Sequence, residues 1–415
     1  MKQSVVVLGA GIVGICCALE LQRRGYQVML IDRRGPGEET SSGNAGVLSY
    51  SNITPLADPS LLSRLHRLIF NLDDDLLVHY PHLMSLFPWL LRFVLRCRRE
   101  TYLHDGDAMA ALTQASIELH KQWIAEAGAQ ELLNRVGGLK LYRHRQTFLR
   151  DQLERELLDR CAVKHTLLDP SQLIDLEPDL KPIFAQGVLI DESVSIRNPE
   201  KLCKAYALMF TAAGGQIRLA SVQSLRQSAE AWELITDQGT ETVSRLVVCM
   251  GAWTPEIIGQ LGYSNPLAIE RGYHTIFTPG ESAGLSGPIF DVDASYVMAP
   301  MDMGLRVTTG SNLTRREARP NPRQVARIIP RVREAFPVGE VVTQEPWMGR
   351  RPTVPDTLPL IGPAPRHDNL WLAFAHSHMG LTMGPITGQL IANFVSGAKQ
   401  PFSTQACDPA RYLQA

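Results

Sequence analysis

The sequence has no excess charge, no metal-binding cysteine pattern and no long apolar run, and each absence excludes a class of protein. Its 42 acidic residues nearly balance its 41 basic ones, so no global field draws the chain toward nucleic acid. No run reaches the roughly eighteen apolar residues that a membrane-spanning helix needs. No repeat period and no low-complexity tract is present. What remains is an ordinary apolar content of 45% over 415 residues, enough for two or three domains.

The seven cysteines are scattered and lack the short spacings of a metal site. Cys16 and Cys17 fall in an expected helix, where adjacent side chains diverge. Because the number is odd, we expect reduced thiols in a cytoplasmic protein and no disulfide framework. The apolar N-terminus is not expected to be a secretory signal, since Lys2 is its only charged leader and its glycines belong to the next motif.

The clearest motif is a glycine turn between a strand and a helix. The apolar run Val5–Leu8 precedes Gly9, Gly11 and Gly14, and a second strand ends at Asp32. The first glycine permits a tight turn, the second lets the backbone approach a pyrophosphate, and the third brings the helix close to the strand. An acid about twenty residues later accepts hydrogen bonds from ribose hydroxyls. The pattern predicts a dinucleotide-binding βαβ unit.

Two alternatives to this interpretation stay open. A carboxylate at Asp32 repels a 2′-phosphate and so disfavours NADP, although Arg33 and Arg34 keep NADP from being excluded. A chance glycine turn in another α/β protein is the second alternative. The strand before the turn, the helix after it and the acid at the right distance all argue against chance.

The rest of the chain predicts a mixture of helices and sheets. The stretch 35–46 is rich in turn residues and is expected to line a ligand. Apolar residues recur at helical spacing from about 59 to 127, and residues 267–309 form short alternating segments typical of an antiparallel sheet. The separate elements that we expect are helices at 107–126, 147–160 and 198–213, a short helix beginning at 169, and strands at 138–143, 216–219, 231–236 and 245–253.

A second informative cluster lies in the last seventy residues. A loop around Gly349-Arg350-Arg351-Pro352 leads to Asp356, and a strand at 369–375 is followed by a turn from His376 to Gly380 and a helix through Val395. A strand, a glycine-containing turn and a helix again present N–H groups to an anionic or electron-rich group. A dehydrogenase that binds only NAD would have no use for this second turn.

These motifs together resemble the superfamily of FAD-dependent D-amino acid oxidases and glycine oxidases, and within it the bacterial D-amino acid dehydrogenases. The matching segments are 9–14 with 32–33, 40–46, 349–352 with 356, and 380–383. The resemblance implies an α/β (α+β overall) fold, with a Rossmann-like FAD-binding domain and a mainly antiparallel-sheet substrate domain with helices. The expected FAD-binding domain comprises 1–58, 190–262 and 346–415, and the substrate domain comprises 59–189 and 263–345.

The resemblance also implies FAD as the cofactor and a role for each matched position. FAD is expected to be non-covalent, since no cysteine stands near Gly380 or Arg351. The residues implied at the pyrophosphate and ribose are Gly9, Gly11, Ile12, Val13, Gly14, Asp32 and Arg33; those beside the ribityl chain and flavin are Thr40, Ser41, Asn44, Ala45 and Gly46. Val222 and Gly251 are expected on the adenine side, and the N–H groups of Gly380, Leu381 and Thr382 at the flavin N1–O2 edge.

On the substrate side, the resemblance implies that Arg351 binds the carboxylate, because a guanidinium binds a carboxylate in bidentate fashion. A surface salt bridge is the alternative for Arg351, and the adjacent Arg350 competes for the role. Tyr273 either covers the substrate or is a half-buried sheet tyrosine. His376 matches a histidine of the dehydrogenases, whereas His378 departs from the pattern and is expected to shape substrate preference. The two histidines lack a third ligand, so no metal site is expected.

The function implied is oxidative deamination of a D-amino acid, with hydride transfer from the α-carbon to flavin N5 and electrons passed to a quinone or other acceptor. D-proline or hydroxy-D-proline substrates are a subclass suggested by the segment 376–385. The alternatives are an oxygen-using amine oxidase of glycine or sarcosine type, and a flavin subunit of a larger electron-transfer assembly. The expected partners are therefore a small amino acid and an electron acceptor, without nucleic acid.

One apolar segment leaves two interpretations open. Residues 83–95 are apolar apart from Ser85, Pro88 and Arg92, and three arginines follow before residue 100. Trp, Phe and Leu next to arginines are typical of a helix lying in a membrane interface. We favour the other interpretation, a helix packed on its own domain. The expected location is cytoplasmic, with peripheral contact to the inner membrane left open.

Overall fold

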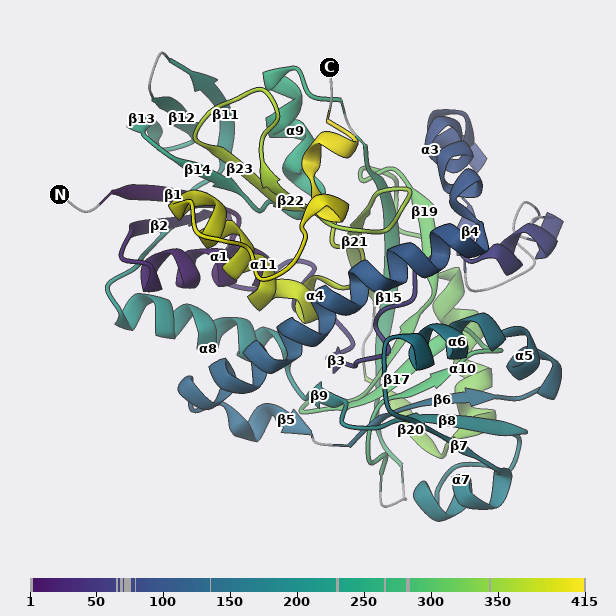
Figure 1. Ribbon diagram of the computed structural model, residues 1–415. Helices are drawn as coiled ribbons and strands as arrows, with labels where there is room; N and C mark the ends of the chain where they lie inside the picture. Colours follow the sequence, from purple (N-terminus) through teal and green to yellow (C-terminus); the bar gives the residue numbers. More distant parts are fainter. Residues whose placement is uncertain are drawn as a thin grey trace.

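The computed structural model describes residues 3–64, 66–67, 70, 76–78, 80–134, 136–228, 231–264, 266–280, 284–342 and 345–413. Two large sheets with their helices lie side by side, and one long helix runs across both (Figure 1). The predicted α/β architecture is therefore confirmed. Parts of the helical segment expected from 59 to 127, at 65, 68–69, 71–75 and 79, lie outside the described residues.

The first sheet is the predicted dinucleotide-binding sheet. Five of its six strands are parallel, and only the edge strand β22 runs antiparallel to its neighbour. In spatial order the strands are β10 (Gln216–Leu219), β2 (Gln27–Asp32), β1 (Ser4–Leu8), β14 (Leu246–Val248), β23 (Leu370–Phe374) and β22 (Leu360–Pro363). The central strands are continuous apolar runs because both of their faces are covered, as is usual for parallel sheets.

Helices cover one face of this sheet and a small sheet covers the other. On the first face lie α1 (Ile12–Arg23), α8 (Pro199–Ala212) and α11 (Gly380–Ser396), with α1 packed between the other two. On the second face lie the helix α9 (Thr254–Ile258) and the antiparallel strands β11 (Val222–Gln227), β12 (Trp232–Thr236) and β13 (Gly239–Val243). The predicted helices at 198–213 and 380–395 are confirmed.

The second sheet has eleven strands and is mostly antiparallel, as predicted; β16 pairs in parallel with β6, and β19 with β4. Its path is β4 (Leu76–Val78), β19 (Ser311–Thr314), β15 (Ala268–Pro279), β18 (Gly304–Thr309), β17 (Tyr296–Met301), β16 (Ile289–Asp291), β6 (Gly138–Tyr142), β8 (Gln186–Ile190) and β7 (His165–Leu168). Two further strands, β20 (Val338–Val341) and β21 (Trp347–Thr353), pair with the long strand β15. The helices α7 (Pro170–Leu176) and α10 (Arg323–Ala335) share an apolar core with this sheet.

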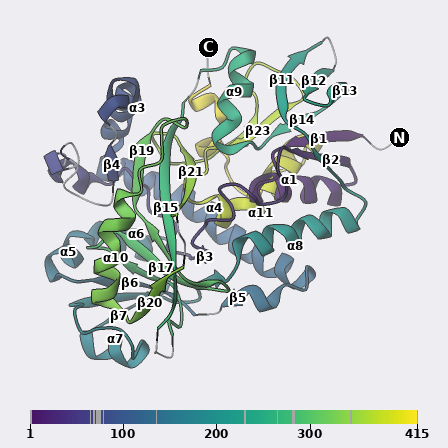
Figure 2. The same ribbon diagram turned by 180° about the vertical axis from the view of Figure 1, so that it is seen from behind.

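The long helix that joins the two halves is α4 (Arg99–Glu126). It crosses the molecule diagonally and packs on α11 (Figure 1). A three-stranded sheet of β3 (Val47–Leu48), β9 (Val194–Ile196) and β5 (Leu133–Asn134) lies near its C-terminal end. The preceding helix α3 (Leu83–Arg96) projects from the body, as both views show (Figure 2). No helix in the described ranges is long and apolar enough to cross a membrane.

Three predicted elements differ from the structure. The helix expected at 147–160 is two helices, α5 (Arg145–Arg150) and α6 (Gln152–Arg160), because Asp151 leaves helical geometry and aspartate competes with the backbone for hydrogen bonds. The strand expected at 245–253 ends at Val248, since the chain turns at Gly251 with a φ of 54°. The segment expected as a loop around Arg351 is the strand β21.

The strands of the first sheet all come from the three segments expected for the FAD-binding domain. The strands of the second sheet come from the other two segments, apart from β21 and the end of β8. The exact domain boundaries stay a prediction.

Candidate active site

One cavity brings the separate motifs together between the two sheets. Its volume is about 400 Å³, within the roughly 300–1,000 Å³ of an ordinary small-ligand pocket. The expected site residues that line it are Gly9, Gly11, Ile12, Val13, Asp32, Arg33, Thr40, Ser41, Asn44, Ala45, Val222, Gly251, Arg351, His376, Gly380 and Leu381. Gly14, Gly46, Thr382 and Tyr273 do not line it.

The glycine turn has the geometry that the motif requires. Gly9 has a φ of 100°, and a Cβ there would lie 2.5 Å from the Cys249 carbonyl oxygen. A Cβ on Gly14 would lie 1.7 Å from the Gly9 carbonyl oxygen, so α1 rests directly on the turn. The helix begins after Gly11, which has no side chain to cap it, and no acid is in its first turn. Its N-terminus is therefore open to an anion such as a pyrophosphate.

Asp32 holds the turn as well as lining the cavity. Its Oδ2 accepts the Ala10 N–H at 2.8 Å, and its Oδ1 accepts the N–H groups of Arg34 and Gly35 at 2.8 and 3.2 Å. A carboxylate oxygen can accept more than one hydrogen bond, so ribose hydroxyls can still bind here. The chemistry of the group fits the ribose of a dinucleotide.

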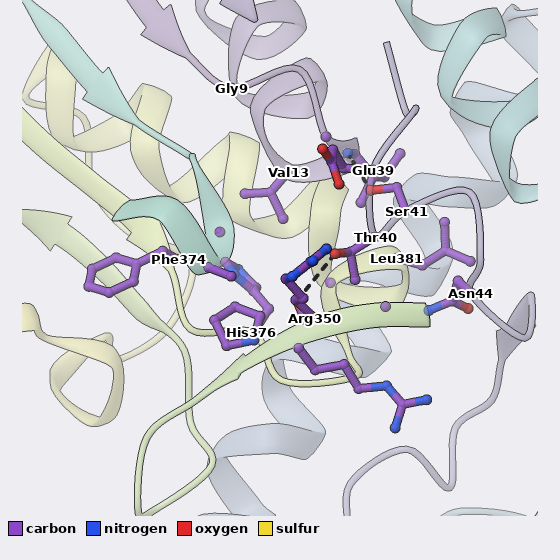
Figure 3. A pocket seen from close by; sticks show the side chains of 18 of the residues that line it. Gly9, Val13, Glu39, Thr40, Ser41, Asn44, Arg350, Phe374, His376 and Leu381 are labelled. Atoms are coloured by element: carbon purple, nitrogen blue, oxygen red, sulfur yellow. Dashed lines mark hydrogen bonds between the residues drawn. The ribbon is translucent and has the colours of Figure 1, made fainter. Parts of the chain in front are cut away.

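The loop from Thr40 to Gly46 is fixed between the two halves of the molecule. Ser41 Oγ accepts the N–H of Ile12 in α1, and Thr40 Oγ1 donates to the carbonyl of Arg350 in β21 at 3.2 Å (Figure 3). Arg306 of β18 donates from Nη1 to the carbonyls of Ser42 and Asn44. Loop residues therefore have partners in α1, which covers the first sheet, and in two strands of the second sheet. Gly46 lies outside the cavity because it packs against β9, where a Cβ would meet the Ile196 carbonyl oxygen at 2.2 Å.

The end of the cavity next to Asp32 carries paired charges around an indole ring. Trp253 has the guanidinium groups of Arg33, Arg316 and Arg350 at 4.2, 5.6 and 5.8 Å from its ring centre. Arg33 is paired with Glu39, and Arg316 with Glu256. We name this region, with Ala220–Val222 and Gly251, the adenosine end.

At the other end, α11 points its N-terminus into the cavity. Like α1, it has no side-chain cap and no acid in its first turn. Gly380 and Leu381 line the cavity, whereas the Thr382 side chain is buried and donates to the Val47 carbonyl. The open helix terminus fits an electron-rich edge of a flavin, where negative charge grows on reduction.

A proline inside this helix makes its first turns depend on α4. Pro385 has no N–H to donate to the carbonyl of Leu381, four residues earlier. His120 of α4 supplies the missing donor from Nε2, 2.8 Å from that carbonyl oxygen. Ser116, one turn earlier in α4, accepts the N–H of Ile386 at 3.2 Å. Two side chains of α4 thus form hydrogen bonds in place of those that α11 cannot form around Pro385.

The partners of His120 also fix its protonation. Because Nε2 must donate to Leu381, Nδ1 is the acceptor for the Tyr206 hydroxyl at 2.9 Å. Burial lowers the pKa of His120 to about 4. His120 is therefore neutral and held in one tautomer beneath the N-terminus of α11.

Arg351 is half-buried in β21 and has few partners. Its Nη1 donates to Ser311 Oγ at 3.4 Å, and Ser311 in turn donates to the carboxylate of Glu270 at 2.8 Å. A Cβ on Gly272 would lie 2.2 Å from Arg351 Nη2, so this glycine makes room for the guanidinium. Burial lowers the pKa of Arg351, and Glu270 opposes that shift. Among the described residues, no carboxylate forms an ion pair with Arg351, which leaves donors for a substrate carboxylate.

Strand register separates Arg351 from its competitor. Arg351 is opposite Glu270 on β15, whereas Arg350 is opposite Arg271. Neighbouring residues of a strand point to opposite faces, so the two arginines diverge. Arg350 extends toward Trp253 and the adenosine end.

The same alternation turns Tyr273 away from Arg351 and favours the second of its two expected roles. Tyr273 is on the face of β15 opposite to Glu270, is 1% exposed, and accepts the N–H of Asn321 at 2.8 Å. It is a buried sheet tyrosine. The matched Asp356 is likewise structural, since its carboxylate pairs with Arg411 near the C-terminus.

The two histidines of the last turn differ in their surroundings. The ring of His376 is buried, and its Nε2 is 3.0 Å from Thr387 Oγ1. That hydroxyl already donates to the Met383 carbonyl, so Nε2 is the donor in the bond to Thr387. Burial lowers the pKa of His376 to about 3. His378 opens onto the cavity, and burial lowers its pKa as well, against the effect of Glu270.

The wall facing these histidines was missed by the sequence interpretation. It comprises Phe290, Val297, Thr308, Thr309 and Trp347 from β16, β17, β18 and β21. Trp347 stacks on His274 with ring centres 4.8 Å apart, and a Cβ on Gly43 would meet its ring at 2.1 Å. We name this wall, with Arg351 and His378, the substrate end. Within the described part of the chain, no three His, Cys, Asp or Glu side chains gather closely enough to hold a metal ion.

Comparisons with known proteins agree with this geometry. A family model described as FAD dependent oxidoreductase matches residues 4–394. A D-amino-acid oxidase of Bradyrhizobium diazoefficiens is 30% identical over 99% of both chains. A D-amino acid dehydrogenase of Xanthobacter autotrophicus is 29% identical, also over 99% of both. The crystal structure of glycine oxidase from Geobacillus kaustophilus covers 100% of both chains with a TM-score of 0.76 and 20% identity, a similarity of fold.

Proposed function

The chain belongs to the DAO family of FAD-dependent oxidoreductases, and from this premise we propose that it is a D-amino acid dehydrogenase. The match confirms the resemblance inferred from the motifs and FAD as the cofactor. The proposal adds three points to the family: the D-configuration of the substrate, a neutral substrate side chain, and an acceptor other than oxygen. Relatives named D-amino acid dehydrogenase support the first and third points.

The observation that carries the proposal is the half-buried Arg351 at the cavity wall, whose guanidinium makes one hydrogen bond among the described residues. A partly desolvated guanidinium that has no carboxylate partner among the described residues is stabilised when a ligand supplies the negative charge. A substrate carboxylate is such a ligand, and bidentate binding fixes its orientation. Because a fixed carboxylate also fixes the α-carbon, Arg351 orients the C–H bond that is broken.

The residues around the glycine turn and α11 would hold FAD along the cavity. The turn and the N-terminus of α1 would bind the pyrophosphate, Asp32 the ribose, and the N–H groups of Gly380 and Leu381 the flavin edge. Bound FAD supplies the hydride acceptor, which no side chain can provide. The role of the protein is therefore to orient the substrate and to set its protonation state.

The charges at the substrate end favour a neutral amine. Arg351 is cationic, the histidines are neutral, and the acids that line the cavity, Asp32, Glu39 and Glu256, are at the adenosine end. An ammonium group close to the Arg351 cation loses its proton more readily than in water, and Glu270, which lies behind Ser311 and does not line the cavity, opposes this effect. The neutral amine is the form from which hydride can leave the α-carbon.

The wall of the substrate end supports a neutral and largely apolar substrate side chain. Phe290, Val297 and Trp347 offer apolar surface, and Thr308 and Thr309 offer hydroxyl groups. The lining there offers no carboxylate for a basic side chain. Small apolar D-amino acids, with D-proline and hydroxy-D-proline among them, fit this surface.

The test is an anaerobic titration of the purified holoprotein with matched D- and L-amino acids, followed by bleaching of the flavin absorption. We expect bleaching by neutral D-amino acids and not by their L-enantiomers or by D-lysine. Bleaching by the L-series or by glycine alone contradicts the proposed substrate class.

A second measurement separates a dehydrogenase from an oxidase. The reduced protein is mixed with oxygen or with a water-soluble quinone, and reoxidation and peroxide are followed. Fast reoxidation by the quinone with little peroxide supports the dehydrogenase. Rapid peroxide formation supports the amine oxidase, and turnover by the isolated chain excludes a subunit that is inactive alone.

A further inference from the structure

Exposed apolar side chains are concentrated in one short part of the chain. Of the fourteen large apolar side chains exposed among the described residues, seven lie between 62 and 95, although this segment is less than a tenth of the sequence. They are Leu62, Phe70, Tyr80, Met84, Phe87, Leu91 and Leu95. The other seven are scattered from residue 149 to 342. A gathered apolar surface of this kind marks an interaction site, whereas single exposed side chains do not.

Four of these exposed apolar side chains form a stripe along α3. Met84, Phe87, Leu91 and Leu95 are spaced by three, four and four residues, which places them on one side of the helix. They are 86%, 56%, 50% and 54% exposed. The helix projects from the body at the upper right of Figure 1, with this side uncovered.

The inner side of the same helix is also apolar, and it is buried. Leu86 packs with Ala268 and Leu313 of the large sheet, and Phe93 packs with Ala57 and Cys97. Packing on the protein therefore explains one face of α3, as the favoured sequence interpretation expected. The outer face has no role in that packing. A helix that is apolar on two sides is expected in a core or in lipid, not at a surface in water.

The charge around the stripe is positive. Residues 59–99 contain six arginines and three aspartates, a net charge of +3, whereas the whole chain has −1. Arg92 and Arg98 are exposed beside the stripe, while Arg96 and Arg99 pair with Asp105 and Glu156. The three aspartates, 73–75, lie outside the described residues.

The stripe is close to the substrate end of the cavity. Trp89, on the inner side of α3, donates from Nε1 to the Thr353 carbonyl at 3.1 Å. Thr353 is two residues from Arg351 and donates from Oγ1 to Ser377 Oγ at 3.1 Å. Ser377 lines the cavity. Three residues thus connect the helix to the cavity wall.

We propose that the outer face of α3 is a docking surface for an anionic phospholipid membrane, with the helix lying in the interface. Apolar side chains that enter the acyl boundary, and arginines that bind lipid phosphates, are the two features such helices need. A second copy of the chain is a poorer occupant, because two identical faces would bring arginines against arginines. The docked orientation places the substrate end beside the membrane, where a lipid-soluble electron acceptor is concentrated.

The test is flotation of the holoprotein with vesicles of phosphatidylethanolamine and phosphatidylglycerol, and with vesicles of phosphatidylcholine. We expect flotation with the anionic vesicles, weakening as salt rises, and little with phosphatidylcholine. The double variant Phe87→Glu/Leu91→Glu is expected to lower the bound fraction at least tenfold. Arg92→Glu/Arg98→Glu is expected to lower it for anionic vesicles.

The matched control is Leu208→Glu, because Leu208 is 68% exposed on α8 and far from the stripe in sequence. All variants are checked for flavin content and for turnover with a soluble artificial acceptor, which must be unchanged. No flotation of the wild type, or an equal loss in Leu208→Glu, overturns the proposal. So does a dimer, seen by light scattering, that the stripe variants dissociate without any vesicle binding. Flotation does not depend on the substrate, so failure here leaves the proposed reaction untouched.

Discussion

The two ends of the cavity are built from different materials. The adenosine end consists of backbone N–H groups, glycines and charges that already have partners: Asp32 holds three N–H groups, and Arg33 pairs with Glu39. The substrate end has a half-buried arginine that pairs with no carboxylate among the described residues, and beside it is His376, which burial keeps neutral. The adenosine end is complete without its ligand, whereas the substrate end lacks a negative charge that the ligand must bring.

This difference assigns cofactor binding to the adenosine end and the reaction of the amino acid to the substrate end. The preformed end holds the cofactor throughout turnover. At the end with the unpaired cation, the largest gain in binding free energy comes when an anionic substrate enters. Substitutions at the adenosine end should therefore change cofactor affinity, and substitutions at the substrate end should change kcat and KM.

The largest expected effect is at the glycine turn. In Gly14→Ala the new Cβ would lie 1.7 Å from the Gly9 carbonyl oxygen, so α1 must move off the turn and the pyrophosphate site is lost. We expect the purified variant to carry almost no FAD by its absorption at visible wavelengths. Gly259→Ala is the control, since nothing lies within 4 Å of its Cβ position. Normal FAD content in Gly14→Ala would contradict this account.

The next effect distinguishes the two neighbouring arginines. Arg351→Leu removes the guanidinium that binds the substrate carboxylate. This should raise the activation free energy of kcat/KM by about 2–5 kcal/mol, which lowers kcat/KM about 30- to 4000-fold, with FAD retained. Arg350→Leu should instead weaken FAD binding and leave the KM for the amino acid within about threefold. Steady-state kinetics and FAD titration measure both. Equal losses of kcat/KM in the two variants would remove the distinction between the ends.

A smaller effect is expected where α4 supports α11. His120→Leu leaves the Leu381 carbonyl without a donor, at a cost of about 1–3 kcal/mol in the free energy of unfolding. The flavin reduction potential should shift as well, because the turn that carries Gly380 and Leu381 loses its support. Pro385→Ala restores an N–H at the right position and should rescue His120→Leu in both measurements. His120→Gln, whose amide can still donate, should be milder than His120→Leu.

The pH dependence of stability gives an independent readout of the same contact. The pKa of His120 is lowered from 6.5 to about 4 in the folded protein, so below pH 6.5 the unfolded state binds a proton that the folded state does not. Stability should fall as pH drops from about 6.5 to 4, by up to about 1.4 kcal/mol per pH unit from this group. In the doubly substituted His120→Leu/Pro385→Ala protein this part of the slope should be absent in urea unfolding. An unchanged slope would assign the titration to other groups.

The smallest effect is at the indole ring of the adenosine end. Trp253→Leu removes the contact with Arg33, of about 0.5–1 kcal/mol, and should raise the Kd for FAD about two- to fivefold. Flavin fluorescence during titration of the apoprotein measures this. Trp347→Leu, at the opposite end, should change the amino-acid KM and leave the Kd for FAD nearly unchanged. A reversed pattern would mean that the ends are wrongly assigned.

The two ends also differ in how far the sequence predicted them. The adenosine end depends on a strand, a turn and a helix that are consecutive in the chain, so the spacing of Gly9, Gly11, Gly14 and Asp32 was enough. The first sheet, α8 and α11 followed from apolar pattern and capping residues for the same reason. These interactions join residues that are close in the sequence, so short sequence motifs are enough to predict them.

The substrate end depends on which face of a strand points inward, and that is set by register between distant strands. The separation of Arg350 from Arg351 and the burial of Tyr273 follow from the pairing of β15 with β21, which no local pattern contains. The wall of Phe290, Val297 and Trp347 was missed for this reason. Gly43 and Gly349 were the available signal, since both make room for the Trp347 ring.

The support of α11 by α4 has a consequence for how such chains can diverge. Pro385 is tolerated because His120 donates in its place, and His120 is useful there because Pro385 cannot. Loss of either residue removes the reason for keeping the other. We therefore expect the two positions, 265 residues apart in the chain, to change together among relatives. In relatives where the helix carries an ordinary residue at the position of Pro385, the position of His120 is free to become apolar.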